Sequence, residues 1–581
     1  QRLRVVNSTL LRDTQSLKHN EGCSTNCLIL TQKIGERIEH GQNTVVIFID
    51  LVKAFDTVRR NLLWARYRSL GLCGKLFWAL KAGYGERTLR GRLNGFLSEE
   101  MPDEGLGVRQ GEVDSSDAFA LFIDDLDAEI QRLEEELGRP LGIPLFGTND
   151  AAKGDRLNAL KHADDTCIIA ANVEDARLLL RAVTRWCQKW AISPNPDKCE
   201  VVIFGPRTNK INPEFEFVGK NLKVVTSVIY LGYKIHQDGT WVPHVERRVT
   251  KAEKWDRLAL QLLGHRGGAT AEVAADVRNA TAEVGVLYGA EFWGSSDPSS
   301  SLSNMVDRSQ GQVGKDILHV RATTEAVGVI TELGWTATST KAWRHRMLFW
   351  WRLGRSSNKL LHDLEWQANH SELSDLESET INPSGYNWWR TTRTEVARLE
   401  QMAGESAEKL RAMSRQNFCK LIDKMAWKSE FHDRKVNMRN SSRLKSYGEE
   451  MEERVLENPR VASWKQLRAD YLPHVSGRDH TRLLAMTRLG ILPIEIETGR
   501  WEGIDRSERL CKFDACKGKL GDTCHFLSEC VGLKTKAIET IWRCKSNCTP
   551  GIWWRETAHP FEKRWREKSL AKKNITGQVA I

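Results

Sequence analysis

The chain has 581 residues, and 86 Lys or Arg against 76 Asp or Glu give a formal net charge of +10. This length exceeds the ~250–300 residues that one hydrophobic core supports, so about two to four domains are expected. No apolar run approaches the ~20 residues of a transmembrane helix, which argues against a membrane partner. The small basic excess is compatible with a polyanionic partner but does not require one.

The chain begins with Gln1, and residues 1–6 lack the apolar core of a signal peptide. We therefore expect an intracellular protein whose sequence starts inside a longer one. Thirteen cysteines without a secretory signal favour reduced thiols or a metal site over disulfides. Six of them lie between Cys511 and Cys548, which indicates a metal site there.

Two elements are predicted near the start. The amphipathic residues 28–38 predict a helix with Ser24 or Thr25 as its N-cap. The apolar residues 45–49 predict a strand that ends at Asp50. The strand therefore delivers a carboxylate at its end.

A helix is expected next, with Asp56 or Thr57 as its cap and Gly71 as its stop. Its apolar positions fall on one face: Val58, Leu62, Ala65 and Leu70. A second helix at 74–84 and a strand pair at 89–96 follow. Asn94-Gly95 predicts the turn of that pair.

Residues 105–111 carry three glycines, and by themselves they are more typical of a turn than of a ligand site. They lead into a predicted helix at 116–137. Its apolar stripe is Ala118, Leu121, Phe122, Leu126, Ile130 and Leu133. A loop is expected at 138–155.

Asp164 and Asp165 stand before the apolar run 166–169, which predicts a hairpin turn. Such a pair is more often a solvated turn than a site. Together with Asp50, however, the pair could hold two divalent cations about 3.5–4 Å apart, as polymerases do. A helix at 173–190, a strand at 200–204 and further strands to residue 235 are expected after it.

The order of these motifs resembles the reverse transcriptases of non-LTR, LINE-like retrotransposons. Residues 48–56 resemble motif A of that family, and residues 107–111 together with 122–126 resemble motif B. Residues 162–165 resemble motif C, residues 195–198 resemble motif D, and residues 230–232 resemble motif E. The resemblance implies an α+β fold: a right-hand polymerase palm with partial fingers, a helical thumb, and a mostly α C-terminal region with a small zinc-binding segment. The resemblance places the partial fingers and palm at residues 1–238, the thumb and its extension at 239–365, and a linker at 366–387. It places a helical basic region at 388–505, the zinc-binding segment at 506–535 and a basic tail at 536–581.

The resemblance also implies metal ligands. Asp50, Asp164 and Asp165 would bind Mg²⁺ or Mn²⁺, and the Leu51 carbonyl would be a further ligand of the nucleotide-bound metal. Lys198 would be the general acid for the departing pyrophosphate. A Lys beside a leaving phosphate can neutralise or protonate it. A solvated loop charge is the alternative for Lys198.

The other implied roles concern the substrate. Phe55 would be the gate that excludes a ribose 2′-hydroxyl by its bulk, and an ordinary core aromatic is the alternative. Arg109, Gln110 and Gly111 would bind the incoming nucleotide and its base pair.

Two positions depart from the family pattern. His162 stands where the family usually has Tyr, and residues 114–116 are Asp-Ser-Ser where it favours Leu-Ser-Pro. The upstream fingers are also expected to be missing. The alternative function is therefore a truncated or decayed remnant that binds nucleic acid without catalysis.

Two further clusters lie in the C-terminal half. Cys511, Cys516, His525 and Cys530 have the ligand types of a tetrahedral Zn²⁺ site, with Cys524 as an alternative ligand. Many elements of the family end in a similar segment. A second cluster could contact phosphate but is more typical of a solvated helix face: Arg434, Lys435, Arg439, Arg443 and Lys445.

The sequence thus predicts an RNA-directed DNA polymerase of a LINE-like retrotransposon. Its expected partners are an RNA template, a DNA primer or target DNA, and dNTPs, in the nucleus and cytoplasm. Template preference, insertion site, an accompanying endonuclease and oligomeric state are outside what the sequence predicts.

Overall fold

The computed structural model describes residues 22–85, 88–102, 105–108, 115–146, 155–205, 213–265, 269–297, 299–370, 385–475, 478–491, 495–512, 516, 518–521 and 525. The chain forms two compact units: Gln1–His244 with Phe349–Val396, and Val245–Leu348 with Ala397–Ile581. Every strand of the described residues belongs to the first unit, and the second is built from helices. This mixture confirms the α+β class. Among the described residues, no helix has the length and apolar character needed to span a bilayer.

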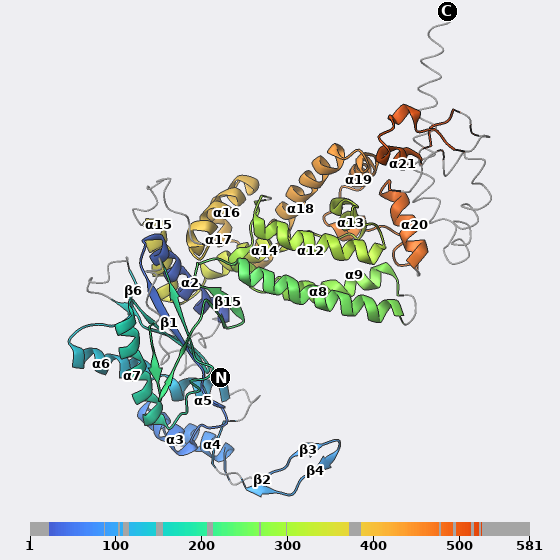
Figure 1. Cartoon of the computed structure of the whole chain (residues 1–581). Helices are drawn as coiled ribbons and strands as arrows, with labels where there is room; N and C mark the ends of the chain where they lie inside the picture. Colours follow the sequence, from blue (N-terminus) through green and yellow to red (C-terminus); the bar gives the residue numbers. More distant parts are fainter. Residues whose placement is uncertain are drawn as a thin grey trace, which may run out of the picture. The chain divides into compact units, whose positions relative to one another are not determined.

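A five-stranded sheet is the centre of the first unit (Figure 1). Its order is β13-β10-β1-β9-β8. The bounds are β1 Thr44–Ile49, β8 Ala159–His162, β9 Asp165–Ala170, β10 Glu200–Phe204 and β13 Lys223–Val224. β1 is the middle strand, antiparallel to β9 and β10, and it is buried along its whole length. The predicted strand at 45–49 is confirmed, because an unbroken apolar run suits a strand covered on both faces.

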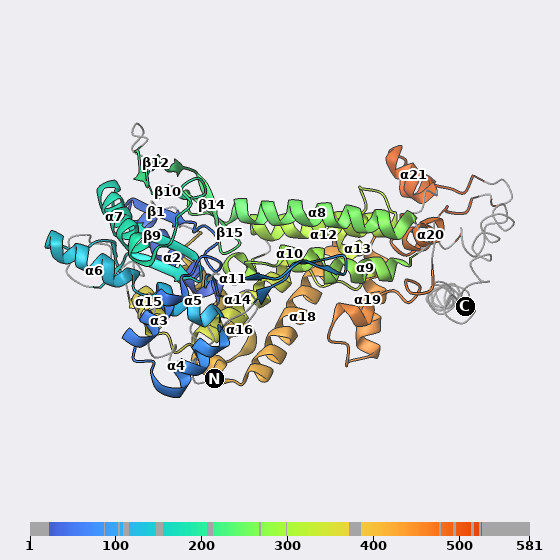
Figure 2. The ribbon, with the colours of Figure 1, turned by 90° about the horizontal axis from the view of Figure 1, so that it is seen from below.

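Three helices pack on this sheet: α5 Ser115–Ile123, α6 Leu126–Leu137 and α7 Val173–Trp190. α7 has the predicted bounds, and α6 lies beside it (Figures 1 and 2). The single helix predicted at 116–137 is wrong, because the chain breaks at Asp124 and Asp125. The Asp125 carboxylate accepts hydrogen bonds from the indole N–H groups of Trp186 and Trp190 on α7.

The helix before β1 is α2, Cys23–Glu39, and it is buried on nearly all sides. The predicted caps Ser24 and Thr25 are wrong, because both lie inside the helix and Gly22 is the N-cap. A helix surrounded by other elements needs no solvated polar face.

Two helices follow β1: α3 Arg60–Ser69 and α4 Gly74–Gly83. The predicted caps Asp56 and Thr57 are wrong, since the Thr57 hydroxyl donates to the Lys53 carbonyl and α3 begins later. Leu63 and Tyr67 are the buried residues of α3. Of the predicted apolar positions, Val58 is buried ahead of the helix, Leu62 and Leu70 pack partly buried against the core, and Ala65 is exposed. The predicted stop is confirmed at Gly71, whose φ of +82° suits glycine.

The remaining strands form two-stranded hairpins and pairs: β2 Thr88–Leu89, β3 Arg92–Leu93, β4 Phe96–Leu97, β5 Met101–Pro102, β6 Ile143–Pro144, β7 Arg156–Leu157, β11 Glu216–Phe217, β12 Lys220–Asn221, β14 Ser227–Tyr230 and β15 Tyr233–His236. The Asn94-Gly95 turn between β3 and β4 is confirmed. Both residues have positive φ, 48° and 89°, as a type I′ turn requires.

A distant segment completes the first unit. It contains the end of α14 Thr338–Leu353, α15 Lys359–His370 and the start of α16 Trp388–Ala403. The Tyr386 hydroxyl accepts a hydrogen bond from the His236 N–H at 2.6 Å, and Gly35 of α2 is so close to Asn387 that a Cβ there would meet its nitrogen at 2.6 Å. The end of the predicted linker 366–387 is therefore packed in the first unit.

The second unit contains the other helices: α8 Val242–His265, α9 Ala271–Ala280, α10 Ala282–Val286, α11 Ala290–Trp293, α12 Ser301–Leu318, α13 Ala326–Glu332, α17 Ala407–Ala412, α18 Arg415–Asn440, α19 Lys445–Glu457, α20 Arg478–Arg488, α21 Glu495–Trp501 and the short 3-10 turns η2 Trp464–Leu467 and η3 Arg506–Glu508. α8 lies along α12 in both views (Figures 1 and 2). Glu332 and Arg488 form a buried ion pair of 2.8 Å in the core of this unit.

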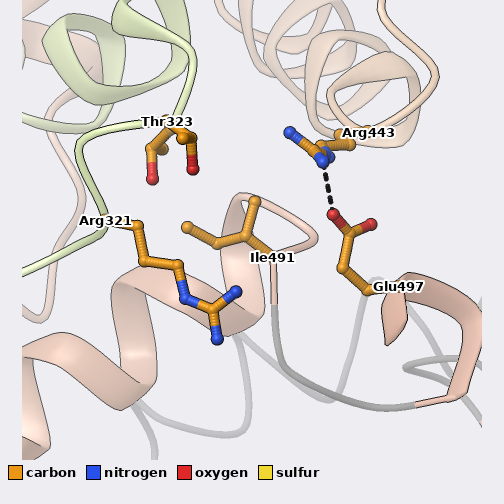
Figure 3. Close-up of a pocket in the computed structure, with 6 residues that line it drawn as sticks. Arg321, Thr323, Arg443, Ile491 and Glu497 are labelled. Carbon is orange, nitrogen blue, oxygen red and sulfur yellow. Dashed lines mark ion pairs between the residues drawn. The ribbon is translucent and has the colours of Figure 1, made fainter. Parts of the chain in front are cut away.

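The basic cluster predicted as a solvated helix face is corrected in part, since Arg439 and Lys445 are exposed and the other members are not. Arg434 is buried beside Glu430, and Lys435 and Arg439 both pair with Glu452 at 2.9 and 2.8 Å. Arg443 also pairs with a glutamate, Glu497, at 2.6 Å, in the wall of a pocket (Figure 3). Sequence spacing along α18 could not show these partners, because most of them belong to other elements.

Candidate active site

Two of the predicted carboxylates face each other across neighbouring strands. The register of β1 and β9 pairs Ile49 with Thr166. If this register is continued by one residue beyond Ile49, Asp50 lies opposite Asp165. Residues opposite each other in an antiparallel pair lie about 4.5–5.5 Å apart and on the same face. The sheet therefore brings together carboxylates that are far apart in the sequence.

The third carboxylate lies in the turn that joins β8 to β9. Asp164 follows Ala163, which holds a positive φ of 51°. Burial, together with the negative charges of Asp164 and Asp50, raises the pKa of Asp165 from 3.8 to about 6. The three carboxylates thus share one electrostatic environment, and that environment favours a cation.

This raised pKa predicts a pH-dependent stability. An acid with a raised pKa favours the folded state most when it is protonated, below about pH 4, and this contribution is lost as the pH rises through about 6. In EDTA, Asp165→Asn should therefore be more stable than the wild-type chain at neutral pH, by an amount on the order of 1 kcal/mol. Melting temperatures of both proteins across this range measure it. A constant difference at all pH values would contradict the prediction.

A turn after α7 is bonded directly to Asp50. The Asn195 side-chain amide donates to Asp50 Oδ2 at 3.0 Å, and the Asn195 N–H donates to the Asp50 carbonyl at 2.8 Å. The Cys199 sulfur accepts the Asp50 N–H at 3.3 Å. These contacts fix the end of β1. Sequence reasoning missed Asn195 and Cys199 as neighbours of the carboxylate, although Asn195 stands in the segment that resembles motif D.

Lys198 comes from the same turn. Its Nζ lies 3.9 Å from Asp50 Oδ2, and its side chain is 71 % exposed. The structure therefore places a solvent-exposed cation close to the Asp50 carboxylate. Its role as a general acid stays a prediction.

Phe55 is half-buried and stacks on Phe119, with 4.5 Å between the ring centroids and 23° between the planes. Its carbonyl accepts the Val108 N–H at 2.8 Å, which holds the motif A segment against the motif B segment. Phe55 thus contributes to the core, and its role as a gate stays a prediction. Leu51 is buried and forms a β-bridge to Pro194.

Arg109, Gln110 and Gly111 lie outside the described residues. Their predicted contacts with the incoming nucleotide stay predictions.

His162 pairs with Asp165 in the register of β8 and β9. Its Nε2 lies 3.3 Å from the sulfur of Cys23 on α2. Burial lowers the pKa of His162, against the opposing effect of Asp164. A histidine therefore fits beside the carboxylates as a packed, flat side chain.

A buried cation supports the hairpin from behind. Lys161 is 1 % exposed, its Nζ lies 2.7 Å from Asp127 Oδ2, and its carbonyl accepts the Asn26 side-chain amide at 2.9 Å. Sequence reasoning missed this group. The sequence signal that could have indicated it is a lysine that directly follows the apolar residues Ala159 and Leu160 of a strand, ahead of the carboxylate pair.

Cys511, Cys516 and His525 form a second cluster, in the second unit. Their ligand atoms all lie within 4.8 Å of one another. The Cys511 N–H donates to the Lys519 carbonyl at 2.8 Å, and the Lys519 N–H donates to the Cys516 carbonyl at 3.0 Å, so a small loop holds both thiols. Two thiols and an imidazole at this spacing fit Zn²⁺, whose bonds to sulfur are about 2.3 Å long. Cys530 and Cys524 lie outside the described residues.

The cluster predicts that the purified chain carries about one Zn²⁺ ion. Cys516→Ser should lose it, because a neutral hydroxyl replaces a thiolate ligand. Cys73→Ser is the matched control, since Cys73 is exposed in the first unit. Metal content measured by mass spectrometry tests this. Equal zinc in both variants would contradict the site.

Comparisons with known proteins bear on the first unit. Residues 1–235 match the family model "Reverse transcriptase (RNA-dependent DNA polymerase)". Among solved structures, the chain is similar to a telomerase from Candida albicans in complex with the TWJ fragment of telomeric RNA. That likeness has 12% identity and a TM-score of 0.27, and covers 67% of this chain and 56% of the telomerase chain, so it carries no argument. No curated protein matches. The family match supports a reverse transcriptase domain at the site described above.

Proposed function

We propose that this chain, through the reverse transcriptase domain of residues 1–235, is the RNA-directed DNA polymerase of a LINE-like retrotransposon. The observation that carries the proposal is the convergence of Asp50, Asp164 and Asp165 at the ends of β1, β8 and β9. In the proposed reaction, the 3′-hydroxyl of a primer attacks the α-phosphate of a dNTP and pyrophosphate leaves.

The three carboxylates fit divalent metal ions. Carboxylate oxygens are preferred ligands of Mg²⁺ and Mn²⁺. The pKa of Asp165 is raised by burial first and then by the charges of Asp164 and Asp50, and a bound cation would offset both effects. When bound, such ions would lower the pKa of the primer hydroxyl and neutralise the phosphates.

The chain's own residues have separate tasks in this proposal. Asn195 orients Asp50 through its two hydrogen bonds. Lys198, on the same turn, would give a proton to the leaving pyrophosphate, because its Nζ is close to Asp50 and its side chain is exposed to solvent. Phe55, held by Phe119, would exclude the ribose 2′-hydroxyl.

The LINE-like subtype rests on the order of the motifs and on the Cys511, Cys516 and His525 cluster. An RNA template, a DNA primer or target DNA, and dNTPs are the proposed partners. Nucleus and cytoplasm are the proposed locations, since such an element copies RNA into a genome.

Primer extension on an RNA template with Mg²⁺ tests the proposal. The wild-type chain should extend the primer, and Asp164→Asn should not. Asp155→Asn is the matched control, because Asp155 is an exposed carboxylate outside the site and should retain activity. Circular dichroism of each protein checks the fold.

The result that overturns the proposal is extension that persists in Asp164→Asn. No extension by the wild-type chain, with primer-template binding retained, would favour the remnant that binds without catalysis. Its support is His162 and the altered motif B segment at 114–116. His162→Tyr would then be the next variant to measure.

A further inference from the structure

The first turn of α2 contacts the strand that leads into the turn with Asp164. β8 is the outermost strand of the described sheet, so one edge of its backbone is not bonded to another strand of that sheet. On this strand the Lys161 carbonyl accepts the side-chain amide of Asn26 at 2.9 Å, and Asn26 is 1 % exposed. Cys23 makes a second contact from the same turn of the helix, because its sulfur lies 3.3 Å from His162 Nε2.

Both contacts act directly before the carboxylates. β8 ends at His162 and β9 begins at Asp165, so the turn between them consists of two residues, Ala163 and Asp164. His162 and Asp165 are opposite each other in the register of the two strands. In a hairpin with so short a turn, the turn and the register are fixed together. A displacement of β8 would therefore displace Asp164 and Asp165 as well.

α2 is itself held by a distant part of the first unit. The Ser24 hydroxyl accepts a hydrogen bond from the Arg352 guanidinium at 3.1 Å. Further along the helix, the Gln32 side-chain amide donates to Asn387 Oδ1 at 2.9 Å, and the Asn387 amide donates to Glu39 Oε2 at 2.7 Å. The last three side chains are buried. Since α2 is bonded near both of its ends, it can serve as a fixed support for β8.

We propose that Asn26 and Cys23 are positioning residues for the metal site. They act through Lys161 and His162, and they hold β8 where its turn can present the carboxylates to a divalent cation. This inference rests on the proposed function, because it concerns the same site. Partners that orient metal ligands from outside typically change metal affinity or activity about 10-fold to 100-fold when they are removed.

The test measures Mn²⁺ binding by electron paramagnetic resonance of the free ion. Only binding that is lost in Asp164→Asn is assigned to the site. Asn26→Ala should weaken this binding about tenfold or more. Thr31→Val is the matched control, because it also removes a buried polar group from α2, but one whose hydroxyl donates within the helix, to the Cys27 carbonyl at 2.7 Å. It should bind Mn²⁺ as the wild-type chain does.

Cys23→Ala tests the second contact with a milder change, because Cys23 is half-buried and a thiol is a weak donor. It should weaken Mn²⁺ binding about threefold. In a His162→Phe background the same change should have no further effect, since the partner of the thiol is already gone. Cys23→Ser, which keeps a donor, should recover most of the lost affinity.

Equal Mn²⁺ binding by the wild-type chain and Asn26→Ala would overturn the proposal. Equal losses in Asn26→Ala and Thr31→Val would overturn it too, because they would show only a weakened helix, and so would a wild-type chain without binding that depends on Asp164. Melting temperatures show whether each variant folds, and Cys23→Ala decides if Asn26→Ala does not. Primer extension is measured separately. A chain that binds Mn²⁺ as expected without extending primers would refute the polymerase and leave this inference standing.

Discussion

Asp50→Asn is expected to reduce primer extension at least about 1000-fold without lowering the melting temperature. Asp50 contributes one of three carboxylates to the site, and the loss of a metal ligand removes the charge stabilisation on which nucleotidyl transfer depends. The stability should hold because the variant removes one of the two negative charges that, after burial, raise the pKa of Asp165. Single-turnover extension on an RNA template, with calorimetry alongside, measures both quantities.

Asp197→Asn is the matched control for this prediction. Asp197 lies in the same turn as Lys198, but its carboxylate is 71 % exposed and pairs with Lys220 at 2.8 Å. It should extend primers at a rate close to that of the wild-type chain. Equal losses in both variants would show that the turn, and not the Asp50 carboxylate, carries the effect.

Lys161→Met is expected to lower the free energy of unfolding by about 3–5 kcal/mol, because it leaves the buried Asp127 carboxylate without its cation. Asp124 Oδ1, at 3.8 Å from the Lys161 Nζ, would lose the same partner. Since Lys161 directly precedes His162 in β8, primer extension should fall as well. Urea denaturation followed by circular dichroism measures the stability.

Two comparisons make this prediction specific. Lys161→Met combined with Asp127→Leu should recover part of the lost stability, because the uncompensated charge is then removed. Lys220→Met should change the stability by less than about 1 kcal/mol, since its pair with Asp197 is exposed. If both lysine variants had the same small effect, the buried pair would not support the hairpin.

The elements that the sequence predicted well have local signals. The helix at Val173–Trp190 and the strands β1 and β10 follow apolar periodicity, which needs no knowledge of the partner element. The turn at Asn94-Gly95 follows from residues that tolerate positive φ. Asp164 and Asp165 in a hairpin follow from the same kind of signal.

The elements that the sequence missed depend on distant partners. α5 and α6 are separate because Asp125 accepts hydrogen bonds from Trp186 and Trp190, which are about sixty residues away. The caps predicted for α2 and α3 were wrong because packing, and not a polar side chain, decides where these helices begin.

The sequence by itself determined which residue types were available: three carboxylates at strand ends, two thiols and an imidazole at short spacing, and clustered arginines. The tertiary structure alone decided which of them meet. The strand register brings Asp50 to Asp165, Lys161 turns inward to Asp127, and Arg443 pairs with Glu497. The physical reason is that apolar periodicity is a property of residues close together in the sequence. Whether a charged side chain is buried, and which partner it has, depends on contacts between distant residues that no local pattern contains.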